Sequence, residues 1–305
     1  MNQHLRIPSP GKQLAIFLGL FGASFLLFGI LSLIVLQVNG VPVISGKMDW
    51  SKPGVVSVFK WLQGLSSIVI FLLTAFVFTL ITYTGKPFYF LGFKKANQPN
   101  MYILAVVALF FALPFVFWMG ELNQKIPLPT WMTSMEKDAL EQMQAFLKVN
   151  NPIDVWVNVF IIAMLPAIGE ELCFRSVLQR IMIRLTRSPW AGILVTGFLF
   201  SLLHFQFEGF LPRMLLGIIL GVLYWYSGSI WTSILAHFFN NALQVLVVSY
   251  MPKYVDTNPS IPVLIAVVSL IATLAILYFY RKISTITYSK VYEVDELTPH
   301  NEFIA

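Results

Sequence analysis

Eight apolar stretches, most of them long enough to cross a membrane, constrain the fold of this chain more than any other feature. A helix needs about 20 apolar residues to span a hydrocarbon core about 30 Å thick. The stretches lie at residues 13–38, 55–84, 102–120, 153–183, 191–205, 211–226, 229–250 and 261–280. Backbone groups inside a bilayer must pair within their own segment, which makes such spans helical. The sequence therefore predicts an all-α, polytopic transmembrane bundle of about eight spans.

The composition narrows the possible partners. Of the 305 residues, 57% are hydrophobic and 11% are charged, whereas a soluble domain has about 25% charged residues. The net charge of +6 is scattered among short loops rather than gathered on one face, so it does not indicate nucleic-acid binding. A single cysteine, Cys173, excludes an internal disulfide and any zinc site built from several thiolates.

The basic residues of the loops predict the orientation in the membrane, because cytoplasmic loops carry an excess of Lys and Arg. With the N-terminus inside, the cytoplasmic side receives Arg6, Lys12, Lys86, Lys94, Lys95, Arg180, Arg184, Arg187, Arg281, Lys282 and Lys290. The other side receives Lys47, Lys52, Lys125, Lys137, Lys148, Arg213 and Lys253. We therefore expect both termini in the cytoplasm and the protein in the plasma (inner) membrane.

One connection differs from the others. Residues 131–150 contain Thr133 and Glu136 at capping-box spacing. Apolar residues then recur at helical intervals among charged ones, at Met135, Leu140, Met143, Phe146 and Leu147. The pattern predicts a short amphipathic helix at the membrane interface. A packed connector and a lid over a substrate path are both compatible with it.

Two adjacent glutamates, Glu170 and Glu171, lie in the fourth stretch, where ionisable groups are costly and mark function. Glu171 and Arg175 are four residues apart, with the acid first, which favours an ion pair on one helix face. Glu170 points about 100° away around the helix. No cation shares its face within a turn, so Glu170 is available to take a proton from water.

Two histidines also lie within apolar stretches, while the other two are in the tails. The fifth stretch contains Phe200 and His204, and the seventh contains His237 and Asn241. Each pair is four residues apart and projects from one helix face. A lone histidine in a membrane span is commonly a helix-to-helix hydrogen bonder. Two of them together with an unpaired glutamate, on three different spans, indicate a site instead.

These residues together resemble the three-motif signature of the CPBP family, which comprises the type II CAAX prenyl endopeptidases and the bacteriocin-processing, or Abi, membrane proteins. The motifs follow one another on successive spans as Glu170-Glu171-xxx-Arg175, Phe200-xxx-His204 and His237-xxx-Asn241. The resemblance covers residues 153 to 250. Each motif alone is weak, but the combination and its order are specific.

The resemblance implies a glutamate-dependent intramembrane endopeptidase that needs no cofactor. At the matching positions, Glu170 acts with His204 to activate the attacking water, and His237 acts with Asn241 to stabilise the oxyanion. Peptide hydrolysis requires a base for the water and donors placed where negative charge develops. The expected partners are membrane lipid and a membrane-associated peptide or protein substrate.

Two alternatives use the same side chains. In a zinc-dependent protease, Glu170, His204 and His237 would supply a two-histidine, one-carboxylate site with an open position. A non-proteolytic immunity or transport protein would use the polar residues for binding, since acids and histidines inside membranes also mark transport paths. The sequence contains no inverted repeat that would favour transport.

The chain is thus predicted to have five parts. These are N-terminal transmembrane helices at 1–130, the amphipathic helix at 131–150, a catalytic core at 151–250, a last transmembrane helix at 251–282 and a polar tail at 283–305. On the sixth stretch, Gly217 and Gly221 form a Gly-xxx-Gly motif, which predicts close packing of helices beside the catalytic spans.

Overall fold

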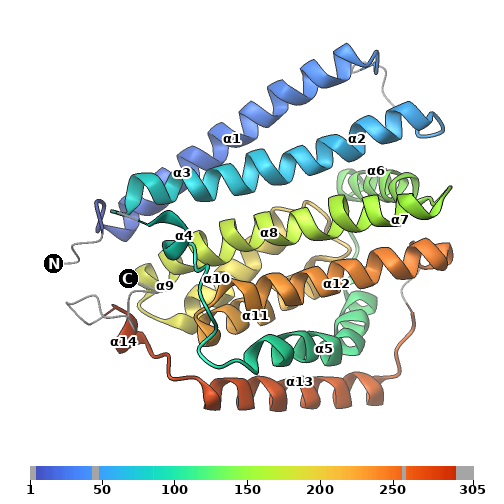
Figure 1. Ribbon diagram of the computed structural model, residues 1–305. Coiled ribbons are helices and arrows are strands. Elements are labelled where there is room, and N and C mark those ends of the chain that lie inside the picture. The colour runs from blue at the N-terminus through green and yellow to red at the C-terminus, as the bar shows by residue number, and fades with distance from the viewer. Residues whose placement is uncertain (1–4, 43–47, 85, 256–258, 293–305) are drawn as a thin grey trace.

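The computed structural model describes residues 5–42, 48–84, 86–255 and 259–292. Seven of its helices are long and apolar enough to cross a membrane, and within the described ranges the regular elements are all helical. The protein is therefore an integral membrane protein built as a polytopic helical bundle, and the predicted fold class is confirmed (Figure 1).

The helices before the predicted core are α1 (Pro10–Val38), α2 (Pro53–Ser66), η1 (Ser67–Leu72), α3 (Leu73–Thr82), α4 (Pro87–Phe90), α5 (Met101–Gln124) and α6 (Thr130–Leu147). One long rod follows, made of α7 (Pro152–Asn158), η2 (Val159–Met164), α8 (Leu165–Glu171), η3 (Leu172–Gln179) and α9 (Arg180–Thr186). The remaining helices are α10 (Pro189–Leu202), α11 (Phe210–Ser227), α12 (Ile230–Tyr250), η4 (Pro252–Val255), α13 (Val263–Ile283) and α14 (Tyr288–Tyr292).

The fifth predicted span differs from the other seven. It corresponds to α10, which has 14 residues and ends at Leu202 rather than at Phe205. At 1.5 Å per residue this helix is about 21 Å long, shorter than a hydrocarbon core of about 30 Å. The eight predicted spans are therefore seven full-length helices and one shorter helix that leads directly into α11.

The two ends of the described chain lie at the same end of the bundle (Figure 1). Close to the start of α1, the carbonyl of Pro8 accepts a hydrogen bond from Arg184 Nη2 of α9 at 2.6 Å. Just after α13, Thr285 Oγ1 accepts one from Asn97 Nδ2 at 2.9 Å. Both ends lie on one side because the chain passes through the bundle an even number of times. The eight predicted spans require the same arrangement.

Helix α6 packs onto the bundle at the opposite end. Phe146 is buried edge-on against Trp50, and Leu147 is buried in a cluster with Val245 of α12. The helix begins at Thr130, one turn earlier than the predicted capping box, so the Thr133–Glu136 cap is not formed. Glu136 Oε1 instead accepts a hydrogen bond from the backbone N–H of Glu208, in the turn before α11, at 3.1 Å.

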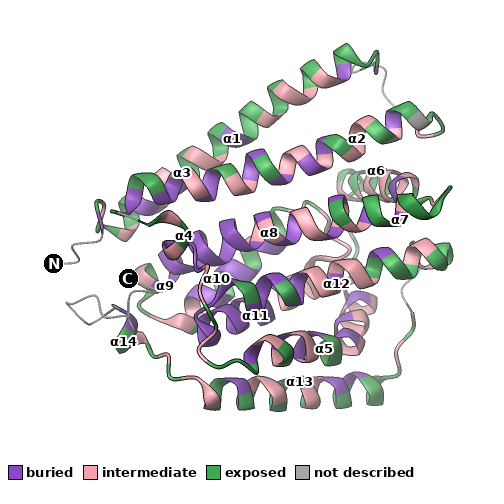
Figure 2. Cartoon of the chain, in the orientation of Figure 1, coloured by how far each residue is buried: buried purple, intermediate pink, exposed green. Residues whose placement is uncertain are grey.

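The most buried part of the molecule is the segment that contains the two glutamates and the residues after them. Every residue from 171 to 183 is buried, and Figure 2 shows this along α8 and α9. Gly169 permits the close approach of η1, because a Cβ there would lie 2.9 Å from the carbonyl oxygen of Ser67. The outer helices α1 and α13 instead expose large apolar side chains, as lipid-facing helices do.

Candidate active site

Glu170 and Glu171 lie at the end of α8, between two segments with π-helical hydrogen bonding, η2 and η3. Pro166 has no N–H to donate and stands in the first turn of α8, so the regular α-helical ladder is interrupted there. π-helical turns inside α-helices are frequent at functional sites. Here they occur on both sides of the glutamate pair.

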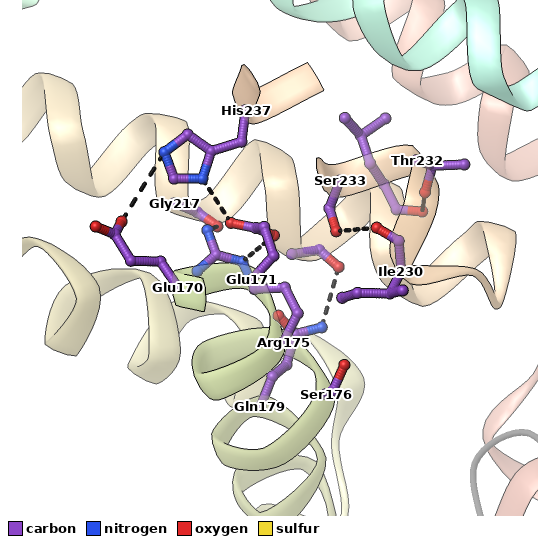
Figure 3. A network of polar contacts seen from close by, with 12 residues as sticks. Glu170, Glu171, Arg175, Ser176, Gln179, Gly217, Ile230, Thr232, Ser233 and His237 are labelled. Atoms are coloured by element: carbon purple, nitrogen blue, oxygen red, sulfur yellow. Dashed lines mark hydrogen bonds and ion pairs between the residues drawn. The ribbon is translucent and has the colours of Figure 1, made fainter. Parts of the chain in front are cut away.

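The ion pair predicted from the i,i+4 spacing is present. Arg175 Nε lies 3.2 Å from Glu171 Oε2, and both side chains are fully buried (Figure 3). The guanidinium also lies 4.6 Å from the centre of the Phe200 ring, and Nη2 donates to the carbonyl of Gly217 at 3.4 Å. Arg175 therefore links the glutamate helix to α10 and α11.

Glu171 has a second partner that the sequence reasoning missed. Its Oε1 lies 2.9 Å from Nδ1 of His237, on α12 (Figure 3). A carboxylate paired with Arg175 is ionised and can only accept, so Nδ1 of His237 carries the hydrogen. This hydrogen bond orients the imidazole and directs Nε2 toward Glu170, 3.9 Å from its Oε2. The two residues are 66 positions apart, so no local sequence pattern predicts the contact.

His204 lies in a turn just after α10, not within the helix as predicted. The backbone tightens there, because the N–H groups of His204 and Phe205 bond to the carbonyls three residues back. His204 Nδ1 donates to the carbonyl of Phe200 at 2.7 Å, and the two rings pack edge to face. The expected association of Phe200 with His204 is therefore present, although it forms in the turn that ends α10 and not along one face of a helix.

The fixed Nδ1 of His204 turns its Nε2 toward Glu170 Oε2, at 3.8 Å. Glu170 Oε2 thus faces both imidazoles, at 3.8 Å from His204 and 3.9 Å from His237. Both separations exceed hydrogen-bond length, and a water molecule between two polar groups is the common way to satisfy such a gap. The side chains of Glu170 and His204 are 12% and 29% exposed, whereas that of Glu171 is fully buried, so Glu170 is the more accessible of the two carboxylates.

Asn241 lies one turn beyond His237 on α12 and is half-buried. Its Oδ1 accepts a hydrogen bond from Asn240 Nδ2 at 3.1 Å. This leaves its own Nδ2 as a donor with no protein partner among the described residues. No hydrogen bond joins Asn241 to Glu170.

Asn123, near the end of α5, supports the site from outside the predicted core. Its side chain is 2% exposed. Nδ2 donates to the carbonyl of Phe207 and Oδ1 accepts from the N–H of Leu211, both at 2.7 Å. These bonds hold the turn between α10 and α11 that carries His204. Sequence reasoning missed Asn123, because a polar residue at the end of a span is too common to be informative.

The three side chains of the zinc alternative lie somewhat further apart than the ligands of a bound zinc ion. Glu170, His204 and His237 provide the donor types that zinc prefers, but tetrahedral zinc with bonds of about 2.0–2.2 Å would bring the donors to about 3.4 Å from one another. The observed separations of 3.8 and 3.9 Å are wider. Within the ranges that the structure describes, no group of three His, Cys, Asp or Glu side chains is arranged to hold a metal ion.

Residues 152–243 match a family model described as type II CAAX prenyl endopeptidase, Rce1-like. Neither the comparison with curated proteins nor that with solved structures finds a match. The matched segment begins at the first residue of α7 and ends within α12, and it covers less than a third of the 305 residues. It contains every motif residue described above. Residues 152–243 therefore form a domain of the CPBP family, whose CAAX-type members are membrane-embedded peptide hydrolases.

Proposed function

We propose that this protein is an intramembrane endopeptidase in which Glu170 and His204 activate the attacking water. The observation that carries the proposal is the position of Glu170 Oε2, which faces the Nε2 atoms of His204 and His237 at 3.8 and 3.9 Å. A carboxylate and an imidazole nitrogen whose hydrogen is on Nδ1 are both acceptors. A water molecule between Glu170 and His204 satisfies both by donating its two O–H groups.

The hydrolysis follows from this arrangement. As the water oxygen attacks the peptide carbonyl carbon, Glu170 takes the proton that the water loses, and the carbonyl becomes a tetrahedral oxyanion. When the C–N bond breaks, the protonated Glu170 returns this proton to the leaving nitrogen. The second proton of the original water stays on the new carboxyl group and is released at neutral pH. His204 orients the water throughout.

His237 and Asn241 are proposed to stabilise the oxyanion. With Nδ1–H held by Glu171, the Nε2 of His237 donates a hydrogen bond only when the ring is protonated. The Glu171 carboxylate at 2.9 Å holds the ring in the orientation that this requires. Asn241 contributes the Nδ2–H that no described protein group uses. Donors of this kind lower the barrier most where water is scarce.

We expect Asn241→Ala to lower kcat about 100- to 1,000-fold with little change in KM, because removal of one oxyanion donor has an effect of this size. Measurement of kcat and KM on a fluorogenic peptide in proteoliposomes tests this. Asn241→Asp is the sharper variant, since a carboxylate replaces the donor with an acceptor at neutral pH and regains a donor when it is protonated. An Asn241→Asp protein with wild-type kcat from pH 5 to 8 would exclude Asn241 from the oxyanion site.

The proposed function is tested most directly by comparing membrane-protein termini between cells with the intact protein and cells with Glu170→Gln. New termini that depend on Glu170 would identify the membrane-associated substrate and its cleavage site. If the two sets of termini were identical under conditions where the protein is present and folded, the non-proteolytic alternative, an immunity or transport role, would replace the proposal.

A metal-free mechanism predicts that hydrolysis survives exhaustive chelation in detergent. The proposed steps use only Glu170, His204, His237 and Asn241, and none of them needs a metal ion. Activity with and without a chelator, together with metal analysis of the purified protein, checks this. Stoichiometric zinc that is lost together with activity and restores it on addition would establish the zinc-dependent alternative.

We also propose that both termini face the cytoplasm. The ends of α9 and α13 lie at the same end of the bundle as the start of α1, and this end contains Arg184, Arg187, Arg281 and Lys282 (Figure 1). Basic residues in short loops favour the cytoplasmic side.

A further inference from the structure

A cavity of about 270 Å³ lies on the side of the bundle away from the glutamate pair, between α5, α11 and α13. Its walls are almost entirely apolar, with Phe115 of α5, Ile218 and Val222 of α11, and Leu270 and Leu274 of α13 among the lining residues. Figure 1 shows α13 beside α5 at the outer edge of the bundle. The cavity is therefore reached from the lipid side of the protein.

One end of this cavity is polar and cationic. Arg281 lines it together with Tyr226, Tyr278 and Trp190. These residues come from the end of α13, the end of α11 and the start of α10, which all lie at the end of the bundle where the described chain starts and finishes. Among the described residues, Arg281 has no acidic partner. Aromatic residues with an amphipathic ring are typical of the membrane–water boundary.

The length of the cavity matches one leaflet. Along α13 it extends from Leu270 to Arg281, which is eleven residues or about 16 Å at 1.5 Å per residue. Half of a hydrocarbon core of about 30 Å is about 15 Å. An acyl chain that fills the apolar part would thus bring its lipid phosphate to the level of Arg281. An unpartnered guanidinium at that position has the geometry and charge to bind a phosphate.

We propose that this cavity is a binding site for one phospholipid, with an acyl chain between α11 and α13 and the phosphate on Arg281. At the end of the cavity furthest from Arg281, hydrogen bonds hold α13 against α5 and leave the cavity open. Pro114 lies inside α5, and Ser269 of α13 bonds to backbone groups on either side of it. The Ser269 hydroxyl accepts from the N–H of Phe115 and donates to the carbonyl of Phe111. This anchor ties α13 to α5, and the cavity opens beside it toward α11.

The bound lipid would support the helix that holds the candidate active site. On its other face, α11 presents the carbonyls of Gly217 and Gly221, which accept hydrogen bonds from Arg175 and from Gln179 at 3.4 and 3.0 Å. An acyl chain in the cavity packs against Ile218 and Val222 of the same helix. Lipid occupancy is therefore expected to raise the thermal stability of the protein, independently of the reaction it catalyses.

The test uses the full-length protein, delipidated in detergent and titrated with phosphatidylglycerol, with bound lipid counted by native mass spectrometry. We expect one tightly bound phospholipid per chain. Arg281→Gln should weaken binding about tenfold, the usual effect of losing one charge-assisted hydrogen bond. Leu274→Trp should abolish it by filling the cavity, since Leu274 is 55% exposed and tolerates a larger side chain.

Two control variants lie outside the cavity lining. Lys282→Gln removes the same charge one residue further on, and Leu264→Trp enlarges a residue of α13 that is 74% exposed. Both are expected to bind phosphatidylglycerol as the wild type does. If Lys282→Gln and Arg281→Gln weakened lipid binding equally, the effect would come from surface charge alone and the proposal would be overturned. Lipid binding that persists in a folded Leu274→Trp protein would overturn the proposal as well. So would a dimer that the cavity variants disrupt and the controls do not, because a second copy of the chain would then cover the cavity. None of these results depends on whether the protein hydrolyses peptides.

Discussion

Glu170→Gln is expected to reduce peptide hydrolysis by about 100- to 10,000-fold, the contribution of a general base, in a protein that still folds and inserts. The amide keeps the shape and volume of the carboxyl group, but it cannot take the proton that the attacking water loses. Glu170 has no ion pair with Arg175, so the substitution leaves no buried charge without a partner. The rate on a fluorogenic peptide and the thermal unfolding temperature, both in proteoliposomes, check the two parts of this prediction.

Glu171→Gln is the matched control, one residue away. It leaves Arg175 without its carboxylate and weakens the acceptor that orients His237, so both stability and rate should fall. The diagnostic pattern is loss of activity at normal stability for Glu170→Gln alone. An active Glu170→Gln protein, beside a stable and inactive Glu171→Gln protein, would show that the roles of the two glutamates are reversed.

Arg175→Met is expected to destabilise the protein by about 3–5 kcal/mol, because it leaves the fully buried Glu171 carboxylate without its cation. Denaturant or thermal unfolding in a defined detergent measures this. The double variant Glu171→Gln/Arg175→Met removes both charges, so it should recover a substantial part of the loss. If the double variant were as unstable as the sum of the single variants, the two charges would not be coupled.

The same double variant separates the structural role of the pair from its part in the reaction. With Gln at position 171, the amide oxygen still accepts from Nδ1 of His237, but it is a weaker acceptor than a carboxylate and orients the ring less firmly. We therefore expect stability to return without full activity. Recovery of both would mean that Glu171 acts on the reaction only by keeping the helix in place.

What the sequence determined by itself was local. Spans of about 20 apolar residues have one way to satisfy their backbone in a bilayer, so the helices and the membrane class followed directly. The Glu171–Arg175 ion pair also followed, because residues four apart on a helix are neighbours in any fold. The close packing at Gly217 and Gly221 was predicted for a similar reason, and Phe200 and Gln179 lie against these glycines.

Only the tertiary structure decided how the polar residues of different helices meet. The hydrogen bond from His237 to Glu171 joins residues 66 positions apart. The hydrogen bond from Asn123 to the turn after His204 joins residues more than 80 positions apart. The apolar composition of α10 likewise did not predict that the helix ends at Leu202. The turn there is held by contacts from α5 and α6, through Asn123 and Glu136. Periodicity describes which face of a helix is apolar, but packing alone sets which other helix meets that face and at what height.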